Sequence, residues 1–281
     1  MKNIFIILNG KGGCGKTTLS RELAACTAEN NHQTLIVDFD AHAAATRTLN
    51  LQYAPSGTSA ADILLNVDHP HAPGYILPTS IKNLYILPAN KDMDELAKEF
   101  DFKVFLNRDG NGEKYSSYRY FKTFLEKIPG YEYVFVDCCD RLDNPLVMNA
   151  LLTGGDILVP VIPKVTGSVE GVIEVIEKLD VYNKIHENCA KILGVVLIGA
   201  DLRSSVSKHN MKDLKELLRN IHIFQTQIRH SIRIDDIGRL MKPLIAAYPR
   251  EEVTQDFRML TKEVLIYAET VKNDGRNVSA V

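Results

Sequence analysis

The feature that most constrains this chain is a glycine-rich run near its start, Gly10-Lys11-Gly12-Gly13-Cys14-Gly15-Lys16-Thr17-Thr18. The run satisfies the phosphate-loop pattern G-x-x-x-x-G-K-[ST]. Glycines at these positions let backbone N–H groups turn inward around a polyphosphate, which side chains would obstruct. We expect all nine residues to bind a nucleotide, with Lys16 at its terminal phosphates and the Thr17 hydroxyl on Mg²⁺.

The flanking sequence supplies the context that such a loop requires. An isoleucine-rich run over residues 4–9 predicts a buried strand before it. Leu19, Leu23 and Cys26 share one face of a helix expected over residues 16–29. A second buried strand over residues 34–39 ends in Asp38-Phe39-Asp40. Strand, loop, helix and strand in this order indicate a nucleotide-binding unit.

Alternating patterns along the rest of the chain predict the fold class. Apolar runs predict strands over residues 84–88, 133–137, 157–162 and 192–198, with a shorter one over 224–228. Helical patterns cover residues 92–105, 118–127, 145–153, 168–183, 208–220 and 251–272. The alternation predicts an α/β fold with a doubly wound, mostly parallel sheet flanked by helices. We expect one domain over residues 1–281, with a polar tail from about residue 273.

Carboxylates stand at the ends of two predicted strands. Asp137 closes the run over residues 133–137, where an acid that acts beside Thr17 on Mg²⁺ belongs. Asp38 and Asp40 are two residues apart on a strand, so both side chains could face the phosphates. We expect Asp38 to join the metal shell and Asp40 to orient the attacking water. The alternative for each aspartate is a cap on the segment that follows it.

Composition limits where the protein works and what it binds. The formal net charge is −2, so binding to nucleic acid or anionic lipid would need a local basic patch. The five cysteines contain no C-x-x-C pair, which favours a reducing compartment. No apolar run approaches the roughly 20 residues of a membrane span. We therefore expect a cytoplasmic protein.

Several segments together resemble a known group. The loop with its second lysine, Lys11, the strand end at Asp38-Phe39-Asp40 and the strand closing at Asp137 are similar to the deviant Walker A ATPases of the ParA/MinD/Soj type, closest to short ParA partition ATPases. The resemblance implies an Mg²⁺-dependent ATPase, weak until a partner stimulates it, in which ATP joins two subunits into a homodimer. It also implies that Lys11 reaches the partner's nucleotide and acts with Lys16 and Asp40 in catalysis.

The chain departs from the pattern of that group near the site. Ala41-His42 follows Asp40 where Pro-Gln is common, Cys139-Asp140 follows the second acidic strand where Pro-Pro is usual, and Arg229 stands where Ile-Pro is common. These changes leave nucleotide binding in place but put the hydrolysis rate in doubt. His42 either tunes the nucleotide switch or is a plain solvent-facing histidine.

A basic helical face suggests a nucleic-acid partner. Lys208, Lys212, Lys215 and Arg219 are spaced 4, 3 and 4 apart, beside an apolar stripe and close to Arg203. Such a row suits sequence-independent contacts with the phosphate backbone, and its alternative is a solvated face. The ParA resemblance implies non-specific DNA binding, a centromere-binding (ParB-like) partner and a role in plasmid or chromosome partition.

Two rival functions remain open. A MinD-like protein would lie on a membrane through a basic amphipathic helix. The last helix here carries Phe257, Leu260 and Val264 on one face, which is typical of core packing, so we expect no membrane binding. The other rival is an ATPase that positions a protein complex without contacting DNA.

Overall fold

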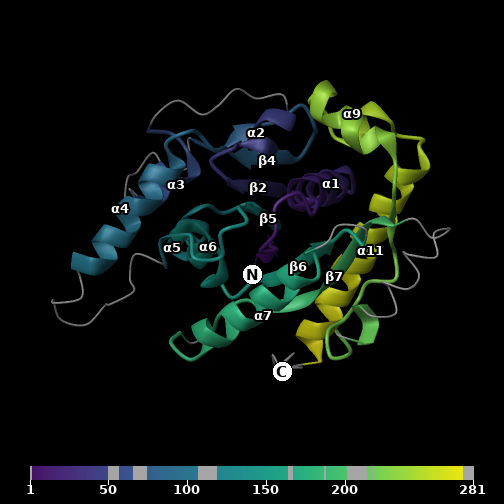
Figure 1. Ribbon diagram of the computed structural model, residues 1–281. Coiled ribbons are helices and arrows are strands. Elements are labelled where there is room, and N and C mark those ends of the chain that lie inside the picture. Colours follow the sequence, from purple (N-terminus) through teal and green to yellow (C-terminus); the bar gives the residue numbers. More distant parts are fainter. Residues whose placement is uncertain are drawn as a thin grey trace.

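One eight-stranded sheet organises the chain. The computed structural model describes residues 2–49, 57–65, 75–106, 119–163, 167–186, 188–200, 214–216 and 218–274. The strands lie in the order β3-β4-β2-β5-β1-β6-β7-β8, parallel throughout except that β3 runs antiparallel to β4 (Figure 1). Their bounds are β1 Asn3–Ile7, β2 Thr34–Phe39, β3 Leu77–Pro78, β4 Leu84–Leu87, β5 Tyr133–Cys138, β6 Asp156–Val161, β7 Lys191–Ala200 and β8 Ile228–Arg229.

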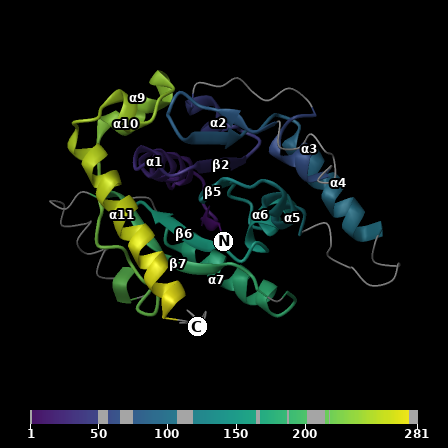
Figure 2. The ribbon, with the colours of Figure 1, turned by 180° about the vertical axis from the view of Figure 1, so that it is seen from behind.

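Helices cover both faces of this sheet, as the predicted fold class requires. One face packs against α3 (Ala60–Leu65), α4 (Met93–Leu106), α5 (Tyr120–Lys127), α6 (Pro145–Leu151) and α7 (Glu170–Asn183). The other packs against α1 (Lys16–Glu29), α2 (Ala44–Thr48), α9 (Ile232–Leu240), α10 (Leu244–Ala247) and α11 (Glu252–Asn273). Figure 2 shows both layers from behind, with α11 crossing the outer side of its layer. The doubly wound, mostly parallel architecture is confirmed.

Alternation within the strands divides the core between these two layers. Ile6 of β1 faces the α3–α7 layer together with Val134 and Val136 of β5. Phe5 of β1 and Phe135 of β5 point the opposite way and stack with ring centroids 5.2 Å apart. A strand buried on both faces reads as one continuous apolar run, which is why the sequence located these strands.

The order of the strands fixes where a ligand can be held. β1 lies between β5 and β6, so β2 to β5 build the sheet on one side of β1 and β6 to β8 build it on the other. In open sheets of this kind, ligands bind outside the carboxyl ends of the strands where the winding reverses. The glycine-rich loop follows β1 at this point, and β2 and β5 end beside it.

The structure also differs from the sequence-based expectations. The predicted strand over residues 224–228 is wrong, because only Ile228 and Arg229 form β8 and Ile223 makes an isolated bridge to Val195. Helices α2, α3, α9 and α10 were not predicted, since four to nine residues are too few for a clear helical period. Only residues 214–216 of the helix predicted over 208–220 are described as helical. No helix in the described ranges is both long and apolar enough to cross a bilayer.

Candidate nucleotide site

The glycine-rich loop adopts the backbone conformation that its glycines permit. Gly13 and Gly15 have φ values of 72° and 91°, in the left-handed region where other residues are strained. Gly15 is also the N-cap of α1, and no side chain caps this helix. The first N–H groups of α1 therefore remain available, and the partial positive charge of the helix N-terminus favours an anion there.

Lys16 lies inside the loop rather than in solvent. Its side chain is buried, and Nζ donates hydrogen bonds to the carbonyl oxygens of Asn9 at 3.2 Å and Lys11 at 2.8 Å. The Cys14 thiol donates to the same Lys11 carbonyl at 3.1 Å and braces the turn. The loop thus holds a cation at its centre, beside the open N-terminus of α1.

Asn9, which sequence reasoning did not single out, anchors the loop. Its fully buried amide donates to the carbonyl oxygens of Pro160 at 2.8 Å and Ser168 at 3.1 Å, and its Oδ1 accepts from the Lys11 N–H at 2.9 Å. Gly171 of α7 packs so closely that an added Cβ would lie 1.9 Å from this Oδ1. A polar residue ending an otherwise apolar strand was the available signal.

Asp137 is a buried carboxylate with no hydrogen-bond partner in the described part of the chain. Its side chain has no exposed surface, and neither oxygen has a hydrogen-bond partner among the described residues. Burial, and then the charge of Asp38, raise its pKa to about 8, against the weaker opposing effects of the nearby Thr17 and Ser20 hydroxyls. A divalent cation would supply the missing partner, so a carboxylate and the Thr17 hydroxyl at this place fit Mg²⁺.

Asp38 lies beside Asp137 but serves a different purpose in this structure. The two residues are in register on β2 and β5. Asp38 Oδ2 accepts from the Thr46 N–H at 2.9 Å and the Thr46 hydroxyl at 2.7 Å, while Oδ1 accepts from the Asp40 N–H at 3.2 Å. Burial raises its pKa to about 6 even though these three bonds favour the charged form. Asp38 therefore binds the first turn of α2 and shapes the turn after β2. It lies beside Asp137, where the sequence predicts the Mg²⁺ site.

Few other groups near the loop could hold a metal by themselves. In the described ranges, no three His, Cys, Asp or Glu side chains gather as a metal-binding cluster. Mg²⁺ usually keeps several waters and takes only one or two protein carboxylates together with phosphate oxygens. Thr17 with one or two strand-end aspartates is a donor set of that kind.

Asp40 and His42 occupy the turn that leads from β2 to α2. Asp40 is one-fifth exposed, and its Oδ1 lies 2.9 Å from His42 Nδ1. The His42 side chain is 88% exposed, so it faces the solvent. Its contact with Asp40 was not foreseen from the sequence.

Lys11 stands at the outer side of the loop. Its Nζ lies 3.1 Å from Glu174 Oε1 on α7, and both side chains are 42% exposed. No sequence pattern pointed to Glu174. A hollow beside this pair is lined by Asp140, Asp143 and Lys178, and further by Leu142, Glu174, Glu177 and Val181. An ion pair between two side chains this exposed contributes little to stability.

The predicted basic face is described only in part. Lys215 and Arg219 are exposed, whereas Leu214 and Leu218 are buried in the core, as the expected apolar stripe requires. Arg203, Lys208 and Lys212 lie outside the described residues.

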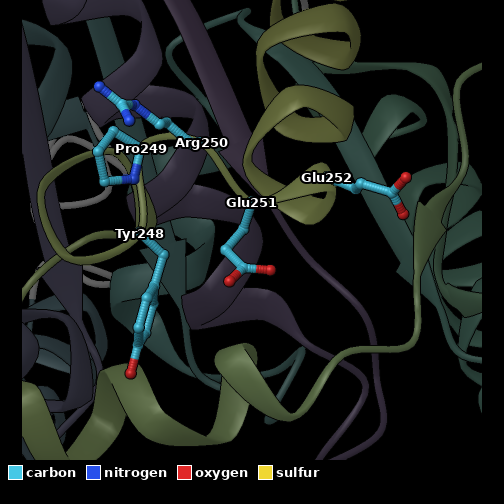
Figure 3. A pocket seen from close by; sticks show the side chains of 5 residues that line it. All are labelled: Tyr248, Pro249, Arg250, Glu251 and Glu252. Carbon is cyan, nitrogen blue, oxygen red and sulfur yellow. The ribbon is translucent and has the colours of Figure 1, made fainter.

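Arg229 is fixed to the start of α11. Its Nε and Nη2 donate to the two oxygens of buried Asp256 at 2.7 and 2.9 Å, and it also pairs with Glu252. A second hollow lies just before α11, lined by consecutive residues from Tyr248 to Glu252 (Figure 3). Figure 3 shows Arg250 directed away from the Glu251 and Glu252 carboxylates. None of the residues Gly10–Thr18 lines this hollow.

Comparison with known proteins gives the chain its relatives. The family model described as an AAA domain (AAA_31) matches residues 1–193. The sporulation initiation inhibitor protein Soj of Bacillus subtilis is 28% identical over 94% of this chain and 98% of its own length. The chromosome partitioning protein ParA of Myxococcus xanthus is 24% identical over 98% and 92%.

A solved structure shares the fold over its whole length. The cobyrinic acid a,c-diamide synthase of Mycobacterium smegmatis, with a bound ATP analogue and magnesium, is 20% identical, covers 100% of both chains and has a TM-score of 0.75. Together with the loop, the strand order and the relatives, these matches confirm the resemblance stated from the sequence. The chain therefore belongs to the AAA domain family AAA_31 and is a P-loop ATPase of the ParA/MinD type.

Proposed function

We propose that this protein is an Mg²⁺-dependent ATPase that dimerises on ATP, binds DNA non-specifically and drives partition of a plasmid or chromosome. The observation that carries the ATPase part is that the site holds both a buried lysine inside the loop, Lys16, and a buried carboxylate near Thr17, Asp137, whose oxygens have no hydrogen-bond partner among the described residues. The solved structure that shares this fold with a bound ATP analogue and magnesium supports the same ligands here.

The residues of the site divide the chemistry among them. Backbone N–H groups of the loop and Lys16 bind the β- and γ-phosphates, and Thr17 with Asp137 holds Mg²⁺, which when bound neutralises the charge that develops on the phosphates. Asp38, in register with Asp137, holds the turn that carries Asp40. Asp40 orients a water whose oxygen bonds to the γ-phosphorus as the bond to the β–γ bridging oxygen breaks, which yields ADP and inorganic phosphate.

Lys11 gives the site its second half. Its bridge to Glu174 joins two side chains that are each 42% exposed, and such pairs contribute at most about 1 kcal/mol. Little therefore holds Lys11 against its own subunit when a second copy presents a nucleotide. In the ATP-bound homodimer, Lys11 stabilises the phosphate charge of the partner subunit, as an arginine finger does.

The DNA-binding part rests on the basic face and on the partition relatives. Lys215 and Arg219 are exposed beside buried Leu214 and Leu218, so a cationic row on this face would reach a phosphate backbone. The relative from Myxococcus xanthus is a chromosome partitioning protein. We assign a centromere-binding, ParB-like protein as the partner that stimulates hydrolysis, and we place the protein in the cytoplasm on the nucleoid.

The last helix argues against membrane attachment. α11 buries Phe257, Leu260 and Val264 in the core, where they pack with residues of α1 and the sheet. The apolar face that would otherwise enter a lipid surface is used inside the fold. We also propose that residues 1–281 form one domain, because a single sheet carries both helix layers.

A DNA-retention assay tests this function. The protein is incubated with non-specific duplex DNA and Mg²⁺ plus ATP, ADP or no nucleotide, across a salt series. We expect retention with ATP alone, weakening steeply as salt rises. Replacing Lys215 and Arg219 with alanine should reduce both the affinity and its salt dependence. Absence of ATP-dependent retention at low salt would overturn the DNA-binding part of the proposal.

A further inference from the structure

The turn after β2 joins His42 to Asp40 by two contacts on one oxygen. The His42 backbone N–H donates to Asp40 Oδ1 at 2.9 Å, and His42 Nδ1 lies 2.9 Å from the same atom. In the described part of the chain, the Asp40 carboxylate makes these two contacts, and both are made by Oδ1. The orientation of the carboxylate is thereby fixed, and Oδ2 is left for another group.

The backbone of the turn holds the two residues in this arrangement. The Asp40 N–H donates to Asp38 Oδ1 at 3.2 Å, and the Asp40 carbonyl accepts from the Ala43 N–H at 2.8 Å. Ala43 has a φ of 50°, which costs a residue with a side chain about 1 kcal/mol or more. The turn keeps this strained residue, so the surrounding structure determines the position of Asp40.

The charges around the imidazole favour its protonated form. Asp40 contributes most, through its hydrogen bond and its charge, and Asp94 and Asp140 add to the negative field, so the pKa of His42 is raised above its ordinary value. Asp94 is itself paired with Arg141. At neutral pH the donor to Asp40 is therefore charged to a greater extent than in a free histidine, and charge-assisted bonds orient their partners more firmly.

We propose that His42 is a positioning residue for ATP hydrolysis, which holds Asp40 through Oδ1 so that Oδ2 receives the attacking water. This role rests on the proposed ATPase function. His42 donates no proton in the step and touches no reacting atom. It acts by keeping Asp40 in one orientation, and small errors in such an orientation slow a reaction without weakening substrate binding.

The test compares two His42 variants with a matched control. His42→Ala removes the ring, whereas His42→Asn keeps a side-chain N–H donor at about the position of the imidazole Nδ1. The control is His32→Ala, because His32 Nδ1 pairs with Glu132 Oε2 at 3.0 Å in the same way. That pair lies at the amino ends of β2 and β5, whereas the loop lies at the carboxyl ends of the strands. ATP affinity, turnover and thermal stability are measured for all four proteins.

We expect His42→Ala to lower kcat about fivefold, the rate equivalent of the strongest exposed ion pairs, with ATP affinity unchanged. His42→Asn should recover most of the lost turnover, and His32→Ala should match the wild type. Unchanged kcat in His42→Ala, or equal losses in both His42 variants, would overturn the role. Wild-type protein that binds no ATP would instead overturn the proposed function itself.

A spectroscopic measurement tests the pair without any turnover. Nuclear magnetic resonance follows the titration of the His42 ring in nucleotide-free wild-type protein and in Asp40→Asn. We expect the pKa of His42 to fall toward its ordinary value in the variant. An unchanged His42 titration would show that the two side chains do not interact in solution and would overturn the inference.

Discussion

Replacing Asp137 with asparagine should make the nucleotide-free protein more stable at pH 8, although it removes a residue of the proposed metal site. Asp137 is fully buried, and neither oxygen has a hydrogen-bond partner among the described residues. Its pKa is raised from 3.8 to about 8, chiefly by burial and then by Asp38. The folded protein therefore keeps a proton that the unfolded chain releases near pH 4.

The sign and size of the effect follow from this difference. Between about pH 4 and pH 8 the folded state binds more protons than the unfolded state, so the stability that the neutral carboxyl contributes is lost as pH rises. Each pH unit is worth about 1.4 kcal/mol, which sets a ceiling of roughly 5 kcal/mol on the whole effect. We expect Asp137→Asn to gain at least about 2 kcal/mol over the wild type at pH 8 and almost nothing at pH 4, since asparagine never ionises.

Urea denaturation at pH 4, 6 and 8 measures this gain, and Asp38→Asn provides the matched control. Asp38 is equally buried on the neighbouring strand, but it accepts three hydrogen bonds from Thr46 and Asp40. An amide would turn a donor toward those donors, which costs about 1–3 kcal/mol. The smaller rise of the Asp38 pKa, to about 6, offsets part of that cost at pH 8, so Asp38→Asn should be clearly less stable than Asp137→Asn at that pH. Equal stability of the two variants at pH 8 without nucleotide would refute the account of Asp137 as a carboxylate without a hydrogen-bond partner in the described residues. With ATP and Mg²⁺ bound, the wild type should instead be more stable than Asp137→Asn, because asparagine carries no charge for the cation.

Three further predictions concern the loop and its neighbours. Lys16→Ala should lower ATP affinity at least about 100-fold by calorimetry, because it removes the buried cation at the loop centre. Gly171→Ala should cost about 2 kcal/mol in urea denaturation, since the new Cβ would meet Asn9 Oδ1 at 1.9 Å and displace the anchor of the loop; unchanged stability would contradict that packing. Asp40→Ala should accumulate an ATP-bound dimer with little phosphate release, and normal turnover in this variant would disprove the assignment of Asp40.

The sheet and the loop could be predicted from the sequence because each rests on local signals. Strands buried on both faces appear as apolar runs, and glycine is favoured where φ is positive, as at Gly13 and Gly15. The strand end at Asp137 was readable for the same reason, because a charged residue closes an apolar run. These signals depend on neighbours in the chain and need no knowledge of tertiary contacts.

The contacts that finish the site could not be predicted in this way. Glu174 reaches Lys11 from a helix more than 160 residues away along the chain, and the loop anchor Asn9 binds carbonyls of similarly distant residues. The division of labour between Asp38 and Asp137 also depends on tertiary structure, since only the first has Thr46 beside it. Two aspartates that look alike in sequence thus differ in their hydrogen bonding within the described residues.

The most direct test of the central claim is the mass of the protein in solution with ATP, with ADP and without nucleotide, for the wild type and Lys11→Ala. Multi-angle light scattering after gel filtration in Mg²⁺ buffer measures it, and Asp40→Ala in parallel limits hydrolysis during the run. We predict a dimer with ATP and a monomer otherwise for the wild type. We predict a monomer in all three conditions for Lys11→Ala, which should still bind ATP. An ATP-dependent dimer undiminished in Lys11→Ala, or a wild-type protein that stays monomeric while saturated with ATP, would contradict the account.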